Sequence, residues 1–75
     1  MTQPKVLMIE KPAPLPNYLY WKQIEYQRFG RAINRVDVAK KTAKRLSDAF
    51  GSNALVVKIN NEKRSIYYVY GNIRG

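Results

Sequence analysis

A chain of 75 residues can build one small hydrophobic core but not two, so we expect a single domain over residues 1–75. It has no cysteine and no histidine, which excludes disulfides and removes the usual ligands of structural zinc. The formal net charge is +9, from 14 Lys and Arg against 5 Asp and Glu. A charge of this sign attracts polyanions, although it specifies no fold.

The first predicted element is a strand over residues 5–11, a short apolar run with a lysine at each end. Residues 12–16 follow, with proline at alternate positions. Proline removes backbone donors and favours an extended chain, so we expect a stiff connector. A proline-rich ligand for another domain is the less favoured alternative, because composition alone identifies such ligands poorly.

Residues 18–29 fit two interpretations. Polar and apolar residues alternate over 22–27, and Tyr18, Tyr20 and Trp21 are typical strand formers, which favours a strand. A helix is the alternative, because Asn17 is a suitable N-cap and Gly30 a suitable C′ residue. We prefer the strand.

Residues 35–50 predict an amphipathic helix. At about 100° per residue, one narrow apolar stripe contains Val36, Ala39, Ala43, Leu46 and Phe50. Asn34 is the expected N-cap, Asp37 lies near the positive end of the helix dipole, and Ile33 with Val38 fits a hydrophobic staple. Gly51 is the expected C′ residue.

Residues 54–59 and 64–70 are β-rich runs separated by a polar turn, which predicts a hairpin, and residues 72–75 are expected to form a mobile tail. The predicted order is strand, strand, helix, strand, strand. This order gives an α+β fold with one amphipathic helix on a mostly antiparallel sheet. One helix covers one face of a sheet, yet both faces of the hairpin carry apolar residues. We therefore expect an exposed apolar face, and either a homodimer formed through it or docking of another protein on it.

Catalysis is not expected. The commonest general acid/base near neutral pH is histidine, and the chain has none. The carboxylates are scattered, the serines lie near helix ends or turns, and no glycines have the spacing of a phosphate-binding loop. We expect a protein that is not an enzyme and that uses no cofactor and no metal.

A basic segment is the strongest functional feature. Residues 28–45 contain one acid, Asp37, and seven basic residues: Arg28, Arg31, Arg35, Lys40, Lys41, Lys44 and Arg45. Such a surface gains affinity for phosphates by releasing counterions. The alternative is an ordinary solvated helix face, supported by pairs such as Asp37 with Lys41 and Lys44 with Asp48.

Aromatic residues interleave with the charges. Tyr67, Tyr68 and Tyr70 follow Lys63 and Arg64. Another group surrounds Lys22 and comprises Tyr18, Tyr20, Trp21 and Tyr26. Single strands are bound by such mixtures, because rings stack on bases while cations follow the phosphates. We therefore add Lys63, Arg64, Tyr67 and Tyr70 to the candidate site, with core packing as the alternative role of the tyrosines.

These features predict a small nucleic-acid-binding accessory or regulatory protein that contacts DNA or RNA mainly through phosphates. The alternative is an adaptor or inhibitor that binds an acidic surface of a larger protein machine. A membrane-surface role is least favoured, because the helix has no large aromatic residue other than Phe50. We expect no membrane span and a cytoplasmic location, since the first residues do not resemble a secretory signal.

Overall fold

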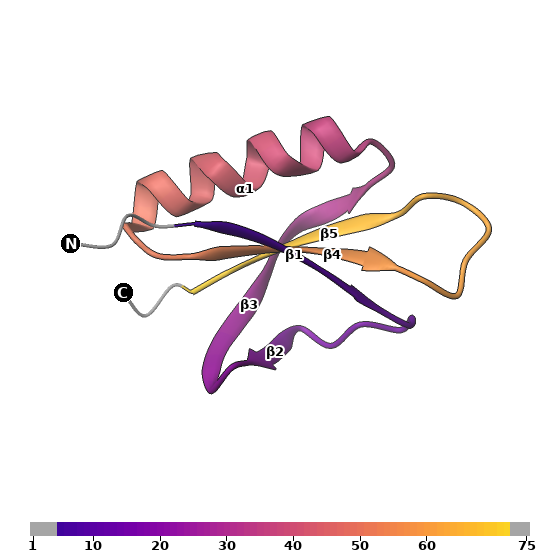
Figure 1. The fold of residues 1–75 in the computed structure, drawn as a ribbon, viewed down its shortest axis with the longest axis horizontal. Helices are drawn as coiled ribbons and strands as arrows, with labels where there is room; N and C mark the ends of the chain where they lie inside the picture. Colours follow the sequence, from indigo (N-terminus) through magenta and orange to yellow (C-terminus); the bar gives the residue numbers. More distant parts are fainter. Residues whose placement is uncertain (1–4, 73–75) are drawn as a thin grey trace.

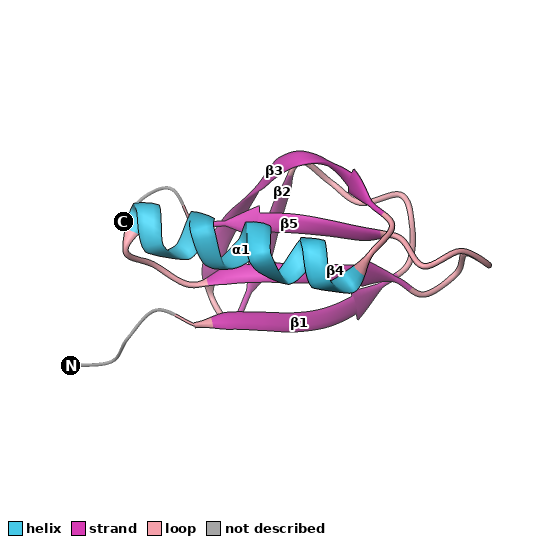
Figure 2. Ribbon diagram, turned by 90° about the horizontal axis from the view of Figure 1, so that it is seen from above, coloured by secondary structure: helices cyan, strands magenta, loops and turns pink. Residues whose placement is uncertain are grey.

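The computed structural model describes residues 5–72. In chain order its elements are β1 (Val6–Lys11), β2 (Tyr18–Trp21), β3 (Ile24–Ile33), α1 (Val36–Phe50), β4 (Ala54–Ile59) and β5 (Tyr67–Gly71). The sheet has the strand order β1-β4-β5-β3-β2, and α1 lies across one of its faces (Figures 1 and 2). β1 pairs with β4 in parallel, while the other neighbours are antiparallel. The predicted α+β class is confirmed, and the sheet is mixed because of this one parallel pair.

The segment 18–29 is β-structure, as preferred, but it forms a tight hairpin of two strands instead of one strand, and the helix alternative is wrong. β2 and β3 are joined by Lys22 and Gln23, whose φ angles are 49° and 67°. Positive φ at both central residues is what a two-residue hairpin turn of type I′ requires. Asparagine and glycine are the usual residues there, so this turn lacks its ordinary sequence signal. β3 also runs on to Ile33, beyond Gly30.

The predicted helix is confirmed, but its start is not. Arg35 occupies the N-cap position without a side-chain cap hydrogen bond, so the expected cap by Asn34 is wrong. Asp37 does lie in the first turn. Val38 is exposed and therefore does not form the expected staple. At the other end Gly51 adopts the left-handed conformation, with φ of 63°, and its N–H donates to the carbonyl of Ser47, as the sequence predicts.

The predicted hairpin after the helix is also present, although β5 begins at Tyr67 instead of residue 64. Residues 60–66 connect the two strands. Beyond β5, the Asn72 carbonyl accepts a hydrogen bond of 2.6 Å from Ser52 Oγ, so this residue is anchored and is not a mobile tail. The remainder of the expected tail, 73–75, lies outside the described residues.

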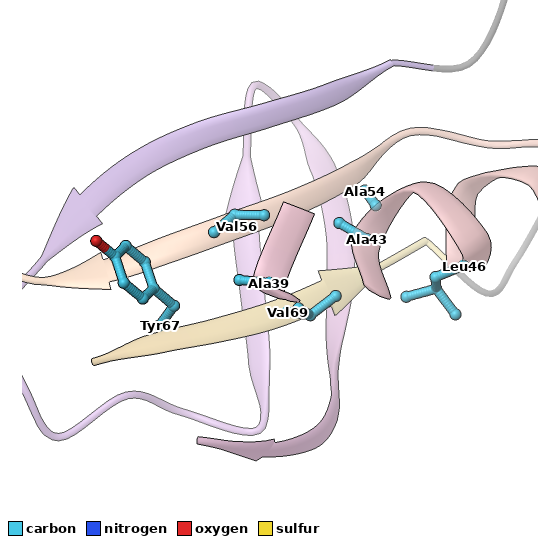
Figure 3. Close-up of a cluster of buried hydrophobic side chains, with 7 residues drawn as sticks. All are labelled: Ala39, Ala43, Leu46, Ala54, Val56, Tyr67 and Val69. Carbon is cyan, nitrogen blue, oxygen red and sulfur yellow. The ribbon is translucent and has the colours of Figure 1, made fainter. Parts of the chain in front are cut away.

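Small side chains let α1 approach the sheet closely. Ala39, Ala43 and Leu46 pack onto β4 and β5 (Figure 3). Leu46 also lies against Gly71, where an added Cβ would overlap the leucine side chain. The predicted apolar stripe is therefore confirmed at its central residues, Ala39, Ala43 and Leu46. At its ends Val36 and Phe50 are exposed, so these two residues are not core residues. The buried cluster comprises Ala39, Ala43, Leu46, Ala54, Val56, Tyr67 and Val69.

The second face of the sheet is covered by the chain itself. Residues 12–17 and the β2–β3 hairpin curl beneath the sheet, on the side opposite α1 (Figure 1). They enclose a second buried cluster formed by Leu19, Tyr26, Leu55, Val57 and Tyr70. The expectation of an exposed apolar sheet face is therefore wrong, and the argument for a homodimer through that face no longer holds.

Three hydrogen bonds hold the connector in place. The Tyr70 hydroxyl donates to the carbonyl of Pro16. The Asn61 side chain accepts from the Ala13 N–H at 2.9 Å and donates to the Ala13 carbonyl at 3.2 Å. The connector is therefore tied to β5 and to the loop after β4, and it closes the second cluster from below.

Leu46 and Gly71 provide a stability test. Leu46→Ala should lower the free energy of unfolding by about 2 to 5 kcal/mol, because it leaves a cavity between α1 and β5. Phe50→Ala should cost less, because Phe50 is 40% exposed. Gly71→Ala should also destabilise the fold, because the new methyl group overlaps Leu46. In the double variant the methyl group enters the vacated space, so its cost should be smaller than the sum of the two single costs.

Denaturant unfolding followed by Trp21 fluorescence measures these free energies, because Trp21 packs against the second cluster. Costs that add within about 0.5 kcal/mol would show that Leu46 and Gly71 do not share a contact.

Candidate functional site

The cations of α1 lie on the sides of the helix that face away from the sheet. The buried residues of α1 are Ala39, Ala43, Leu46 and Ser47. The exposed basic residues are Lys40, Lys41, Lys44 and Arg45, which we call the helix cations. Asp37 and Asp48 are exposed on the same helix, so its surface carries four basic and two acidic side chains. The structure therefore brings these four predicted site residues together.

The helix cations form no ion pairs with the acids of α1, all of which lie in the described part of the chain. Within residues 5–72 the one ion pair joins Arg35 and Asp37, with 3.4 Å between Nη2 and Oδ2, and both side chains are largely exposed. An exposed pair of this kind contributes about 1 kcal/mol or less. The expected pairs Asp37–Lys41 and Lys44–Asp48 are not formed in the described chain. The exposure of these cations is what both a solvated face and a binding face require. The helix cations are available to an external anion.

The other predicted cations are dispersed. The Arg28 guanidinium lies 5.5 Å from the centroid of the Tyr68 ring, on the face opposite α1. Arg31 is exposed within the irregular part of β3, and Arg35 directly precedes α1. Lys63 and Arg64 are exposed in the loop 60–66, at the end of the molecule where α1 begins (Figure 1). The eleven predicted site residues therefore do not form one patch.

Two predicted stacking residues are in the core. Tyr67 is 8% exposed within the cluster beneath α1, and Tyr70 is 0% exposed within the second cluster. Neither ring has a free face on which a base could stack. Their predicted role in binding is therefore wrong, and core packing, the alternative drawn from the sequence, is what the structure shows.

Other aromatic side chains are exposed. The exposed fractions are 56% for Tyr18, 68% for Tyr20, 44% for Phe29 and 40% for Phe50. We call these four residues the aromatic face. Tyr18 and Tyr20 belong to β2, Phe29 to β3, and Phe50 ends α1. They come from three elements but from one side of the sheet.

The strand register establishes that common side. Tyr18 pairs with Gln27 on β3, and paired residues point to the same face of a sheet. Gln27 pairs in turn with Gly71, the residue that Leu46 covers from the helix side. Phe29 follows Gln27 by two residues and shares its face, because side chains alternate along a strand. Tyr18 and Phe29 therefore share the face of the sheet that carries α1, and the curl of the β2–β3 hairpin turns the β2 end of this face away from α1 (Figure 1).

A groove opens between α1 and β3 at one end of the aromatic face. The rings of Phe29 and Phe50 meet edge to face there, with centroids 6.4 Å apart and an interplanar angle of 71°. The groove has a volume of about 400 Å³, within the usual range for small-molecule pockets. Its lining is apolar except for two side chains and consists of Phe29, Thr42, Arg45, Leu46, Ala49 and Phe50. Arg45 thus joins the helix cations to the aromatic face.

The aromatic face was only partly visible in the sequence. Tyr18 and Tyr20 alternate with Leu19 and Trp21, and this alternation places the two tyrosines on one face of a strand. It does not indicate which face is buried. The meeting of Phe29 with Phe50 depends on how α1 docks on the sheet, and no local pattern encodes it.

Comparisons of the chain with protein-family models, with curated proteins and with solved structures found no match. Within residues 5–72 no group of three or more His, Cys, Asp or Glu side chains is arranged to hold a metal ion. The helix in this part of the chain is too short and too polar to cross a membrane.

Two buried tyrosines should make the folded protein less stable at alkaline pH. Burial raises the pKa of Tyr26, partly offset by a hydrogen bond with Asn53. Burial also raises the pKa of Tyr70. The charge of Arg28 lowers this pKa, and the interaction with Tyr68 raises it further. The unfolded chain ionises these groups near pH 10, whereas the folded protein keeps them neutral to higher pH. Their stabilisation should be complete below about pH 10 and decline as the pH rises above it.

Thermal melts between about pH 8 and about pH 11 should show Tm falling steeply above about pH 10 in the parent protein. The fall should be shallower in Tyr70→Phe, which cannot ionise at that position. Tyr70→Phe also loses the hydrogen bond to the Pro16 carbonyl. That loss lowers Tm at every pH, so it can be distinguished from a change in the steepness of the fall. Parallel curves for the two proteins would rule out this role for Tyr70.

Proposed function

We propose that the protein binds DNA or RNA through phosphate contacts made by the helix cations, as a small accessory or regulatory protein and not as an enzyme. The observation that supports this most strongly is that all four helix cations are exposed and, among the described residues, form no ion pair, on a chain with a net charge of +9. Binding a polyanion on such a surface releases counterions, which supplies affinity without base recognition.

The arrangement of the helix cations fits an extended anion. Lys40 and Lys44 are four residues apart, as are Lys41 and Arg45, so each pair places two charges about one helical turn apart along the helix. Repeated positive charges along one direction suit a chain of phosphates better than a single small anion. A chain without cysteine is compatible with the reducing cytoplasm, where we place this function.

The second candidate is an adaptor or inhibitor that binds an acidic surface of a larger protein. The apolar groove lined by Phe29 and Phe50 favours it, because buried aromatic anchors dominate the energetics of many protein interfaces. Arg45 in the groove would supply charge complementarity to such a surface.

A charge-removal variant tests the first proposal. The four changes Lys40→Gln, Lys41→Gln, Lys44→Gln and Arg45→Gln should preserve α1, because Gln is a comparable helix former and all four side chains are exposed. Affinity for duplex DNA should fall, and the slope of log K against log salt should become shallower by about 0.9 for each phosphate that the variant no longer neutralises. The fall in affinity should be nearly independent of base sequence.

The matched control is Lys5→Gln with Lys11→Gln, which removes charge next to and within β1, an edge strand of the sheet. Per charge removed, this control should change the salt slope less than the helix variant does. Equal changes in salt slope per charge removed would show that DNA binding depends on net charge and not on a defined surface. A folded helix variant with an unchanged salt slope would favour the protein-partner candidate.

A further inference from the structure

We propose that the aromatic face is a stacking platform for the unpaired bases of single-stranded nucleic acid. This inference rests on the proposed nucleic-acid binding and specifies its ligand. It assigns to Tyr18, Tyr20, Phe29 and Phe50 the stacking role that the buried Tyr67 and Tyr70 cannot perform.

Tyr18 and Tyr20 are exposed although the hairpin that carries them buries other side chains in the second cluster. Leu19 lies between Tyr18 and Tyr20 on the short strand β2 and is buried in the second cluster. Tyr26 on β3 is buried in the same cluster. The β2–β3 hairpin therefore has a packed inner face, while its outer face presents two tyrosine rings that are more than half exposed.

Strand register and the Phe29–Phe50 contact place the four side chains in succession along one track. Tyr18 and Tyr20 share one face of β2, and their cross-strand partners are Gln27 and Glu25. Phe29 lies two residues beyond Gln27, about 7 Å along the strand, and contacts Phe50 of α1. A polymer with a base at regular intervals can engage several such rings in succession, as single strands do on known aromatic platforms.

Positive charge borders this track at the end where β3 meets α1. Arg45 lines the groove beside Phe29 and Phe50. At the other end, Lys22 is in the turn after β2, but its Nζ lies 5.9 Å from the centroid of the Trp21 ring, which packs against the second cluster on the opposite face. Phosphates that follow stacked bases would therefore meet a cation at the α1 end of the track. Glu25 is the acidic residue on the hairpin, and it is half-buried.

Unpaired bases fit this surface better than a duplex does. An exposed ring stacks on the face of a base, and in a duplex both faces of each base are occupied by its neighbours. The aromatic face therefore adds nothing to duplex binding, which depends on the helix cations alone. For a single strand the rings and the cations act together, with Arg45 shared between them.

The test measures the binding of labelled oligo(dT) of about 12 nucleotides, a length within the usual site sizes of small single-strand binders. Tyr18→Leu with Tyr20→Leu removes two rings and keeps apolar side chains. Tyr18→Phe with Tyr20→Phe is the matched control, because it keeps both rings. We expect the leucine variant to lose about 5- to 150-fold in affinity per stacked base, with an unchanged salt slope. The phenylalanine variant should bind about as tightly as the parent.

Duplex DNA of random sequence separates this inference from the proposed function. The leucine variant should bind it as the parent does. If the parent binds neither oligo(dT) nor duplex, the proposed function itself fails. If the parent binds oligo(dT) and the leucine variant binds it equally well, only the stacking platform fails. Thermal melts identify a folding defect, and the single variant Tyr20→Leu then replaces the double one, because Tyr20 is 68% exposed.

Poly-glutamate, an acidic polymer without bases, tests whether the aromatic face recognises an acidic protein instead of a single strand. If it binds the parent as tightly as oligo(dT) does and loses the same factor in the leucine variant, the aromatic face recognises an acidic protein partner. That result would overturn the single-strand inference. Poly-glutamate binding that is weaker and insensitive to the leucine changes would support it.

Discussion

One helix can cover only one face of a sheet, and the central strands of this sheet are apolar on both faces. Val56 and Val69 lie under α1, whereas Leu55 and Val57 point to the other side. The chain must therefore cover the second face with its own remaining residues. It does so with the proline-containing connector and the curled β2–β3 hairpin, which the hydrogen bond from Tyr70 to Pro16 holds against β5. In a chain this small, where the stability margin is narrow, that second cluster supplies much of the available core.

The aromatic face is a consequence of the same curl. A strand that presents one face to a core presents the other face to solvent, because its side chains alternate. The hairpin turns its inner face to the second cluster, so Tyr18 and Tyr20 project outward beyond the edge of α1. Phe50 at the end of α1 meets Phe29 where the helix leaves the sheet uncovered. The element that completes the fold therefore also carries the surface that we propose binds single strands.

Periodicity predicted the elements well and their environments poorly. The helix over residues 36–50 and the final hairpin followed from local patterns, since their apolar spacing reflects local geometry. The turn at Lys22 and Gln23 did not, because neither residue is a usual member of such a turn. The role of each tyrosine was also hidden. Tyr70 is buried and Tyr20 exposed because of strand register and the curl of the hairpin, which are long-range properties that composition does not encode.

Photochemical crosslinking locates a bound strand on the native protein without any substitution. Ultraviolet irradiation of the complex with oligo(dT), followed by mass spectrometry of the peptides, identifies the residues that contact bases. We expect adducts on the β2 tyrosines, Tyr18 and Tyr20, and on the ring pair Phe29 and Phe50. Adducts confined to the loop 60–66, or none despite salt-dependent binding, would contradict this expectation.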